Sequence, residues 1–235
     1  MKLLALESSA KAASCAVLSD GEVLATAWQA TGLTHSRTLQ PMLEDMLSNS
    51  ELSLRDMDAI AIAAGPGSFT GLRIGIAAVK GLAWAVELPC IPVSTLEAMV
   101  WPLAHLEGNI VCAMDARRQQ IYNAVFVAEG GTLTRLREDR AISLEDAAVD
   151  LAELDGPKMI VGDGAKLCYD YLTGRGIDCR LAPPHLRLQS AAGVGMAAYR
   201  LWPEGAVSSQ ELAPVYLRLS QAERERLARE AKSDC

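Results

Sequence analysis

The stretch "AAGPGSFTGLRIG" (63–75) is the strongest candidate for chemistry in this sequence, because its glycines stand between an apolar run and a predicted helix. Such a junction presents free backbone amides and the positive end of a helix dipole, which together can hold a phosphate group. It matches neither the Walker pattern nor the Gly-x-Ser-x-Gly elbow. Two interpretations therefore stay open, an anion contact and a purely structural turn. A second junction, "GDGA" (162–165), is equally unspecific, and the candidate contacts are Gly65, Gly67, Ser68, Gly162 and Gly164.

Two acidic residues end apolar runs that look alike. Glu7 and Asp115 each close a predicted strand, so they could bind a metal or act as bases if they face a cleft. The alternative is that a strand end is simply where a polar residue meets solvent. The histidines His35, His105 and His185 are isolated, without the pair spacing of a metal site. The scattered cysteines form no Cys-x-x-Cys pair, which favours reduced thiols in a cytoplasm.

Composition limits the classes of function. The chain has 235 residues, half of them hydrophobic, and a net charge of −7. This acidic balance argues against a main nucleic-acid-binding surface, which needs a basic footprint. The start of the chain is too short for a signal peptide, and we expect no run long enough to span a bilayer.

The strand pattern occurs twice. Strands are predicted at 2–8, 14–19 and 22–29, with a tight Asp20-Gly21 hairpin between the last two. The same order returns about 108 residues later. Further strands are predicted at 58–64, 89–94, 109–116, 120–128, 132–138 and 158–165. The pattern predicts an α/β fold of two similar domains, 1–106 and 107–235, each a mixed sheet with flanking helices.

Helices are predicted between these strands. Apolar spacing indicates a helix over 34–50, in which Pro41 is tolerable if Thr38 or a near neighbour is the N-cap. The segment 95–106 reads as a helix interrupted near Pro102. Other helices are predicted at 72–86, 143–154, after "GDGA" and at 190–202.

The helix at 72–86 carries only two charges, Arg73 and Lys80, and is small or apolar almost all round. A helix with one buried face should show a polar stripe, so this one needs cover on two sides. Its small residues would let another backbone approach, and the preceding helix adds methionines, which adapt well at interfaces. Burial of both helices within one domain is the alternative. The candidate interface residues are Leu39, Met42, Leu43, Met46, Gly71, Arg73, Ile74, Gly75, Ala77, Ala78, Lys80, Gly81 and Trp84.

Several stretches together resemble one protein family. They are "LLALESSAKAASCAVLSDGEV", "THSRTLQPML", "AGPGSFTGLRIGIAAVKGLAWAVELPCIPVSTLEAM", "MDARRQQIYNAVF" and "PVYLR". From residue 2 to about 218 the chain resembles the TsaB family, also called YeaZ, in the actin, hexokinase and Hsp70 superfamily. The resemblance implies two actin-like (ribonuclease H-like) domains. It also implies a role in making threonylcarbamoyladenosine in tRNA.

The resemblance extends to TsaD, which transfers a threonylcarbamoyl group to the adenosine beside the anticodon. After the equivalent of "IPV" (91–93), TsaD carries His-His-Met-Glu-Gly-His, whose second and last histidines hold the catalytic metal. The matching positions here are Thr95 and Met99. A hydroxyl and a thioether replace two imidazoles poorly. The resemblance therefore implies a pseudo-enzyme without catalytic or metal-binding residues.

The resemblance also implies partners. TsaB pairs with TsaD through the helices matching 36–49 and 71–86, forming a four-helix bundle, and the same faces pair two TsaB copies when TsaD is absent. The ATPase TsaE binds near that junction. We therefore expect no cofactor on this chain alone, ATP or ADP only in the complex with TsaE, tRNA contact only through the complex, no membrane, and a cytoplasmic location.

Two other function classes remain open. One is a small-molecule kinase or ATPase of the actin-like fold, using Glu7 or Asp115 with the glycine loops. The other is a glycoprotease-type peptidase, which the missing histidine pair and serine elbow disfavour. The charged tail after residue 218 is expected to be mobile.

Overall fold

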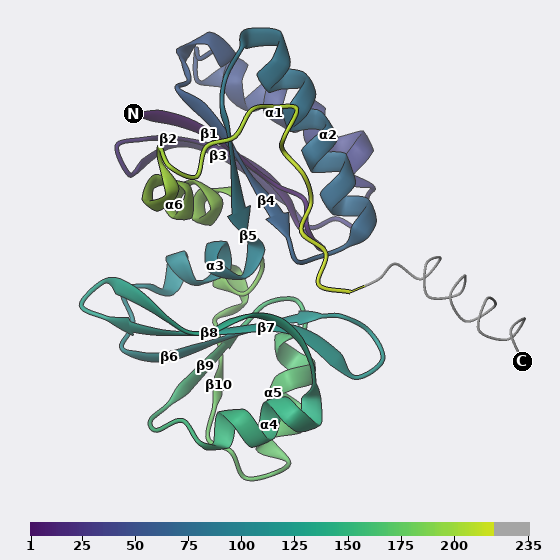
Figure 1. Cartoon of the computed structure of the whole chain (residues 1–235), viewed down its shortest axis with the longest axis vertical. Helices are drawn as coiled ribbons and strands as arrows, with labels where there is room; N and C mark the ends of the chain where they lie inside the picture. The colour runs from purple at the N-terminus through teal and green to yellow at the C-terminus, as the bar shows by residue number, and fades with distance from the viewer. Residues whose placement is uncertain (219–235) are drawn as a thin grey trace, which may run out of the picture.

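The computed structural model describes residues 1–218, and the charged tail beyond residue 218 lies outside the described residues. Within residues 1–218 two five-stranded sheets lie one above the other (Figure 1). The first has the order β3-β2-β1-β4-β5, and the second the equivalent order β8-β7-β6-β9-β10. The first sheet contains β1 (Lys2–Glu7), β2 (Ala13–Ser19), β3 (Glu22–Gln29), β4 (Ala59–Gly65) and β5 (Cys90–Ser94). The second contains β6 (Gly108–Asp115), β7 (Gln120–Glu129), β8 (Thr132–Ser143), β9 (Lys158–Val161) and β10 (Arg180–Leu181).

The predicted duplication and the mixed α/β class are confirmed. In each sheet the first strand pairs antiparallel with the second and parallel with the fourth. Glu7 and Asp115 end the equivalent strands β1 and β6. Asp20 and Gly21 both have positive φ, +50° and +90°, as a two-residue hairpin turn requires.

Helices cover both faces of each sheet. α1 (His35–Asn49) and α2 (Phe69–Val86) lie on one face of the first sheet, and α6 (Ala191–Leu201) lies on the other. α4 (Leu144–Ala152) and α5 (Ala165–Thr173) cover the far face of the second sheet. α3 (Thr95–Val100) lies between the two sheets (Figure 1). Single 3₁₀ turns occupy Leu54–Asp56, Trp101–Leu103 and Pro184–Leu186.

Side chains along β1 alternate between the two faces of the first sheet, so the strand contributes to a hydrophobic core on each face. Leu4 and Leu6 face α1 and α2, whereas Leu3 and Ala5 face α6. All four side chains are fully buried, which is why the strand reads as a continuous apolar run.

The chain returns to the first sheet after the second is complete. The predicted boundary at residue 106 separates the two sheets, but α6 packs on β1, β2, β4 and β5. The following segment, residues 206–218, is called the strap here. Val207 exchanges two backbone hydrogen bonds with Cys90, and the Val215 amide donates to the Ala64 carbonyl at 2.8 Å. Residues 107–218 are therefore not one contiguous packing unit, because α6 covers the second face of the first sheet.

Helix ends differ from the predicted ones in two places. α1 begins at His35 with Thr34 as its N-cap, so Pro41 lies inside the helix and not in its first turn. Pro41 is exposed, and the helix continues past it although one amide donor is lost. α2 begins three residues earlier than predicted, directly after Ser68. α3 ends before Pro102, as expected.

α2 is long and apolar enough to cross a membrane by length and composition, which the sequence analysis did not anticipate. A core helix passes the same test. Here Leu72, Ile76, Val79 and Ala83 are buried on the first sheet. We therefore treat α2 as a helix of the domain, with one face packed on the sheet and one face turned outward.

Candidate docking face and interdomain cleft

The glycine loop is filled by backbone from elsewhere in the chain. A Cβ at Gly65 would come within 2.2 Å of the Val215 carbonyl oxygen in the strap, and Gly65 has a φ of +136°. A Cβ at Gly67 would lie 2.5 Å from the Ser9 carbonyl oxygen. The Ser68 amide donates to that same carbonyl, and the Ser68 hydroxyl caps α2 by accepting from the Gly71 amide. The loop is therefore a tightly packed turn that starts a helix.

Gly71 and Gly75 serve the same internal purpose. A Cβ at Gly71 would lie 2.1 Å from the Ser8 carbonyl oxygen, and one at Gly75 would lie 2.2 Å from Ser8 Oγ. The Ser8 hydroxyl donates to the Gly71 carbonyl at 2.9 Å. These two predicted interface residues thus face the β1–β2 loop of their own chain. A second backbone could therefore approach α2 closely only at other positions of the helix.

Both charges of α2 turn toward the strap. Arg73 Nε donates to the Tyr216 hydroxyl at 3.0 Å, and Tyr216 stacks on Phe69 with ring centroids 4.5 Å apart. Lys80 Nζ donates to the Gln210 carbonyl at 3.2 Å. Both cations of α2 thus form hydrogen bonds with the strap. The helix face beside them carries no charged side chain.

That uncharged face is exposed and apolar. Trp84 is 74% exposed, which is the largest value among the exposed large hydrophobic residues of the described part. Ala77 and Gly81 are exposed, while Ile74 and Ala78 are half-buried. Within residues 1–218, no atom beyond the adjoining residues and backbone of α2 itself lies within 4 Å of a Cβ built at Gly81, so a partner's backbone could come close there. These five residues are called the α2 stripe below.

The predicted residues of α1 divide between core and surface. Leu39, Leu43 and Met46 are buried in the core between α1, α2 and the sheet. Met42 is half-buried and packs at the margin of that core. Of the α1 residues proposed for an interface, only Met42 has surface left to offer a partner.

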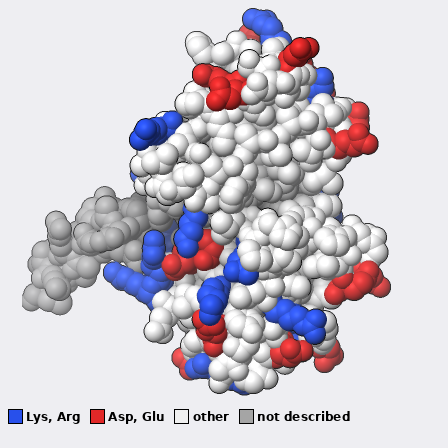
Figure 2. All heavy atoms as spheres, turned by 180° about the vertical axis from the view of Figure 1, so that it is seen from behind, with Lys and Arg blue, Asp and Glu red and all other residues white. Residues whose placement is uncertain are grey.

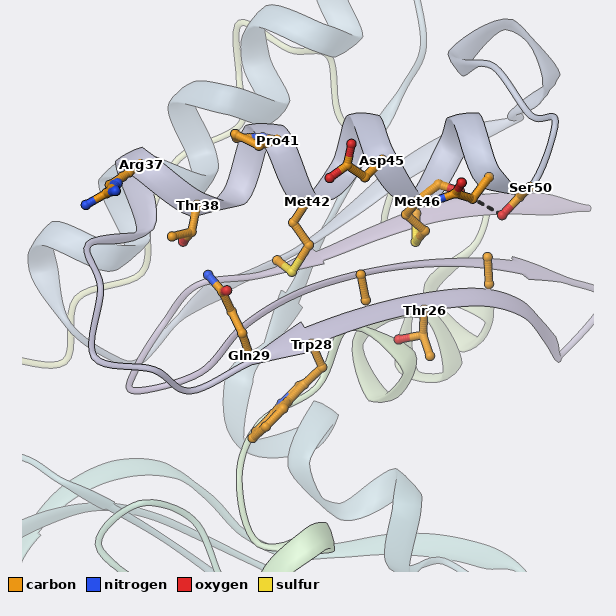
Figure 3. A pocket seen from close by; sticks show the side chains of 13 residues that line it. Thr26, Trp28, Gln29, Arg37, Thr38, Pro41, Met42, Asp45, Met46 and Ser50 are labelled. Atoms are coloured by element: carbon orange, nitrogen blue, oxygen red, sulfur yellow. Dashed lines mark hydrogen bonds between the residues drawn. The ribbon is translucent and has the colours of Figure 1, made fainter.

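A groove of about 640 Å³ runs between α1 and the edge strand β3. Figure 3 shows Met42 and Met46 pointing from α1 toward β3. Gln29 rises from the strand toward Met42, and Arg37 lies apart at the start of the helix. Trp28 of β3 is half-exposed, and its indole nitrogen donates to the Gln189 carbonyl at 3.1 Å. The lining of the groove is mixed, with Met42 and Met46 beside polar and charged side chains such as Gln29, Arg37 and Asp45.

The two positions matched to metal ligands lie in the core. Thr95 and Met99 are one helical turn apart on α3, with exposures of 0% and 2%. Met99 packs among apolar residues of the second sheet, and Thr95 Oγ1 has no hydrogen-bond partner among residues 1–218. Among residues 1–218 no group of three or more His, Cys, Asp or Glu side chains is placed to hold a metal ion. This donor set does not fit the metal that TsaD is expected to hold.

A second cavity lies where the two domains meet. This interdomain cleft has a volume of about 490 Å³ and is lined from both domains, by the β1–β2 loop and the start of α2 on one side and by the β6–β7 loop on the other. Its charged lining residues are Lys11, Arg117, Arg118, Arg218, Asp115 and Asp163. Seen from behind, blue and red side chains gather at this junction (Figure 2).

The carboxyl groups near the cleft all form hydrogen bonds, and burial raises the pKa of two of them. Asp115 accepts from the Arg117 amide at 2.7 Å and pairs with its guanidinium. Asp163 accepts from the Asp115 amide at 3.2 Å, and burial raises its pKa. Glu7 is fully buried and accepts from the Ser9 amide at 2.5 Å. Burial raises the pKa of Glu7 to about 7, so this acid is partly protonated at neutral pH.

Only some of the candidate anion contacts reach this cleft. Gly67 and Ser68 line it. Gly65 lies under the strap, and Cβ atoms at Gly162 and Gly164 would lie within 3 Å of the Ala113 carbonyl and the Asp115 amide. The candidate contacts did not include Lys11, Arg118 and Arg218, because these cations lie in three separate loops and form no sequence motif.

Comparison with known proteins places the chain in a family. Residues 29–227 match the family model described as TsaD, tRNA N6-adenosine threonylcarbamoyltransferase. The tRNA threonylcarbamoyladenosine biosynthesis protein TsaB of Escherichia coli is 32% identical over 93% of this chain and 95% of its own length. TsaB of Bacillus subtilis is 30% identical over 95% and 96%.

The structure agrees with the sequence comparison. YeaZ from Pseudomonas aeruginosa superposes with a TM-score of 0.76 at 26% identity, covering 92% of this chain and 99% of the other. The predicted α/β fold of two similar domains is thereby confirmed. The chain therefore belongs to the TsaB (YeaZ) family of tRNA threonylcarbamoyladenosine biosynthesis proteins.

Proposed function

We propose that this chain is a non-catalytic subunit that binds and activates TsaD for transfer of the threonylcarbamoyl group to tRNA. The observation that carries the proposal is the α2 stripe. It presents Ile74, Ala77, Ala78, Gly81 and Trp84 on the outward side of a helix whose only two cations are held by the strap.

An apolar helix face of this kind favours a helical partner. Small residues at Ala77 and Gly81 allow close approach, and Trp84 supplies the large aromatic area typical of interface anchors. Met42 of the neighbouring helix α1 keeps partly exposed surface in the groove between α1 and β3. We take the partner to be the matching helix pair of TsaD, or a second copy of this chain when TsaD is absent.

The lack of suitable donors supports the non-catalytic role. Thr95 and Met99 are buried and offer a hydroxyl and a thioether where TsaD is expected to offer imidazoles. His35, the histidine nearest the glycine loop, contacts the Ala10 carbonyl through Nε2 at 2.7 Å and anchors the start of α1. The donors expected of a glycoprotease are not assembled in the described part.

The remaining expectations belong to the same proposal. The complex works in the cytoplasm, where the five described cysteines, all free and buried, stay reduced. TsaE joins at the TsaB–TsaD junction and brings ATP or ADP with it, and tRNA is contacted through the complex.

A reconstitution experiment tests the proposal. Purified TsaD, TsaE, tRNA and threonylcarbamoyl adenylate are incubated with and without this chain, and modified adenosine is measured by mass spectrometry of the digested tRNA. Modification should require both this chain and TsaD. Equal modification without this chain, or modification with this chain in the absence of TsaD, would overturn it.

A further inference from the structure

A further groove lies at the C-terminal end of α2. It has a volume of about 510 Å³ and is lined by the last turn of the helix, by Leu88 and Pro89 after it and by residues 206–209 of the strap. Trp84, which belongs to the α2 stripe, forms part of its wall, so the groove continues the stripe at this end. Among the described residues, Glu87 is the only charged side chain in its lining.

The last turn of α2 leaves two carbonyl groups without donors. The Leu88 amide donates to the Ala83 carbonyl at 3.0 Å and is therefore not available to the Trp84 carbonyl. Pro89 has no N–H to offer the Ala85 carbonyl. Unpaired carbonyl groups at a helix end carry the negative pole of the helix dipole. The helix therefore presents partial negative charge at the groove.

The Glu87 carboxylate adds a full negative charge at the same place. Glu87 is exposed and forms the left-handed C-cap of α2, with a φ of +57°. Its carboxylate forms no ion pair or hydrogen bond with any residue of 1–218. Lys80, one turn before Trp84, donates to the Gln210 carbonyl at 3.2 Å and does not line the groove. The negative charge at this end of the helix is thus open to a cation from outside the chain.

The Trp84 indole supplies an aromatic surface beside that charge. It is 74% exposed, and tryptophan attracts a cation to its ring face more strongly than the other aromatic side chains. Arginine suits the groove better than lysine, because its planar guanidinium stacks on a ring while several N–H groups donate to carboxylate and carbonyl oxygens. Leu88 and Val207 give the groove apolar walls for the stem of such a side chain.

We propose that this groove takes an arginine side chain of TsaD, with the guanidinium over the Trp84 ring and donating to the Glu87 carboxylate. The inference rests on the proposed function for the place of docking, and it adds the chemistry that the partner must present there. A second copy of this chain fits less well, because both cations of its α2 bind its own strap. A neutral or acidic side chain in place of the arginine would leave Glu87 uncompensated, so the groove selects partners by charge.

A titration of the isolated full-length chain tests the groove without a partner. The probe is N-acetylarginine amide, and N-acetylcitrulline amide is its neutral control of nearly the same shape. NMR follows the indole N–H signals of the isotope-labelled chain, and the signal lost in Trp84→Phe identifies Trp84. The test variant is Glu87→Gln. Its matched control is Glu145→Gln, at an exposed glutamate of α4 outside the groove.

The arginine probe should shift the Trp84 signal saturably, with at least threefold weaker binding in Glu87→Gln and unchanged binding in Glu145→Gln. The citrulline probe should give no saturable shift. Absence of saturation by the arginine probe at tens of millimolar would overturn the groove as a cation site. Equal binding of the two probes, or equal losses in the two variants, would also overturn it.

Sedimentation velocity with purified TsaD tests the assignment to that partner. At low salt Glu87→Gln should weaken the complex by about tenfold, and added salt should weaken the wild-type complex more than the variant complex. If Ala77→Glu weakens the complex while Glu87→Gln behaves like Glu145→Gln, docking through the α2 stripe holds and the arginine contact is wrong. If Glu87→Gln weakens only the homodimer, the cation comes from a second copy and the assignment to TsaD is wrong. If TsaD does not bind the wild-type chain, the proposed function and the assignment to TsaD both fail, whereas the probe titration still decides the groove.

Discussion

Gly75 of α2 packs directly against Ser8, so that a Cβ at this glycine would lie 2.2 Å from Ser8 Oγ and 3.1 Å from the Ile62 side chain. Gly81 lies six residues further along the same helix, and beyond the adjoining part of α2 no described atom lies within 4 Å of its Cβ position. The two glycines of this helix therefore lie in opposite environments. Gly75 is packed against the interior of its own chain, and Gly81 lies at an open surface.

Alanine at these two glycines should have opposite effects on stability. Gly75→Ala should lower the free energy of unfolding by about 1–3 kcal/mol, because the added methyl group overpacks the contact with Ser8. Gly81→Ala should raise it by about 0.5–1 kcal/mol, since alanine favours an exposed helix. Urea denaturation measures both values. If Gly75→Ala stabilised the chain, the prediction would be wrong, because the β1–β2 loop would then move aside at little cost.

The buried carboxyl of Glu7 should make stability depend on pH. Burial raises its pKa from 4.5 to about 7, so the folded chain keeps a proton that the unfolded chain has lost between these values. The free energy of unfolding therefore falls as the pH rises from about 4.5 to about 7, by about 3 kcal/mol in total from this group.

Glu7→Gln isolates that effect. Glutamine keeps an oxygen to accept from the Ser9 amide but does not titrate. The variant should be more stable than the wild type at about pH 8 and nearly equal to it at about pH 4.5. Denaturation curves at several pH values give the comparison, and identical pH slopes for both proteins would contradict it.

Arg135 joins α3 to the second sheet. Its guanidinium bonds Glu97 of α3 at 2.9 Å and Asp139 of β8 at 2.5 Å, and it lies over the Phe126 ring. Arg135→Ala leaves two partly buried carboxylates without this partner and should lower the free energy of unfolding by about 2 kcal/mol.

An exposed ion pair provides the control for Arg135. Lys166 and Asp170 pair on α5 with side-chain exposures of 66% and 55%, so Lys166→Ala should cost about 0.5 kcal/mol. Both variants are compared by urea denaturation. Equal effects would mean that the Arg135 network adds no more than a surface pair.

The sequence predicted what depends on local pattern. The strands, the Asp20-Gly21 turn and the apolar α2 follow from hydrophobic spacing and turn chemistry, and the duplication follows from their order. Long-range packing was not predictable in the same way. The return of α6 to the first sheet and the contact of Val215 with Gly65 join segments more than a hundred residues apart, and no periodicity encodes such contacts.

The candidate site shows the same division. The composition of α2 predicted a second covered side, and the candidate interface residues included both buried and exposed positions of the helix. Gly71 and Gly75 turned out to pack on Ser8, whereas Ala77, Gly81 and Trp84 carry the open face. Lys11 and Arg118 come from opposite domains and line one cleft only in the folded chain, so their separation in the sequence concealed them.

The most direct test of the central claim is the affinity of the chain for TsaD when a charge is placed on the α2 stripe. Ala77 is exposed in the isolated chain, so Ala77→Glu should fold normally. Val149→Glu on α4 is the matched control, because Val149 is an apolar helix residue with 65% exposure, outside the α2 stripe.

Sedimentation velocity with purified TsaD gives the dissociation constant for each variant. An unpaired charge buried in the interface costs about 3 kcal/mol, so Ala77→Glu should weaken the complex by about 100-fold while Val149→Glu leaves it unchanged. The homodimer should weaken in parallel. Unchanged affinity of Ala77→Glu for TsaD would contradict docking through α2.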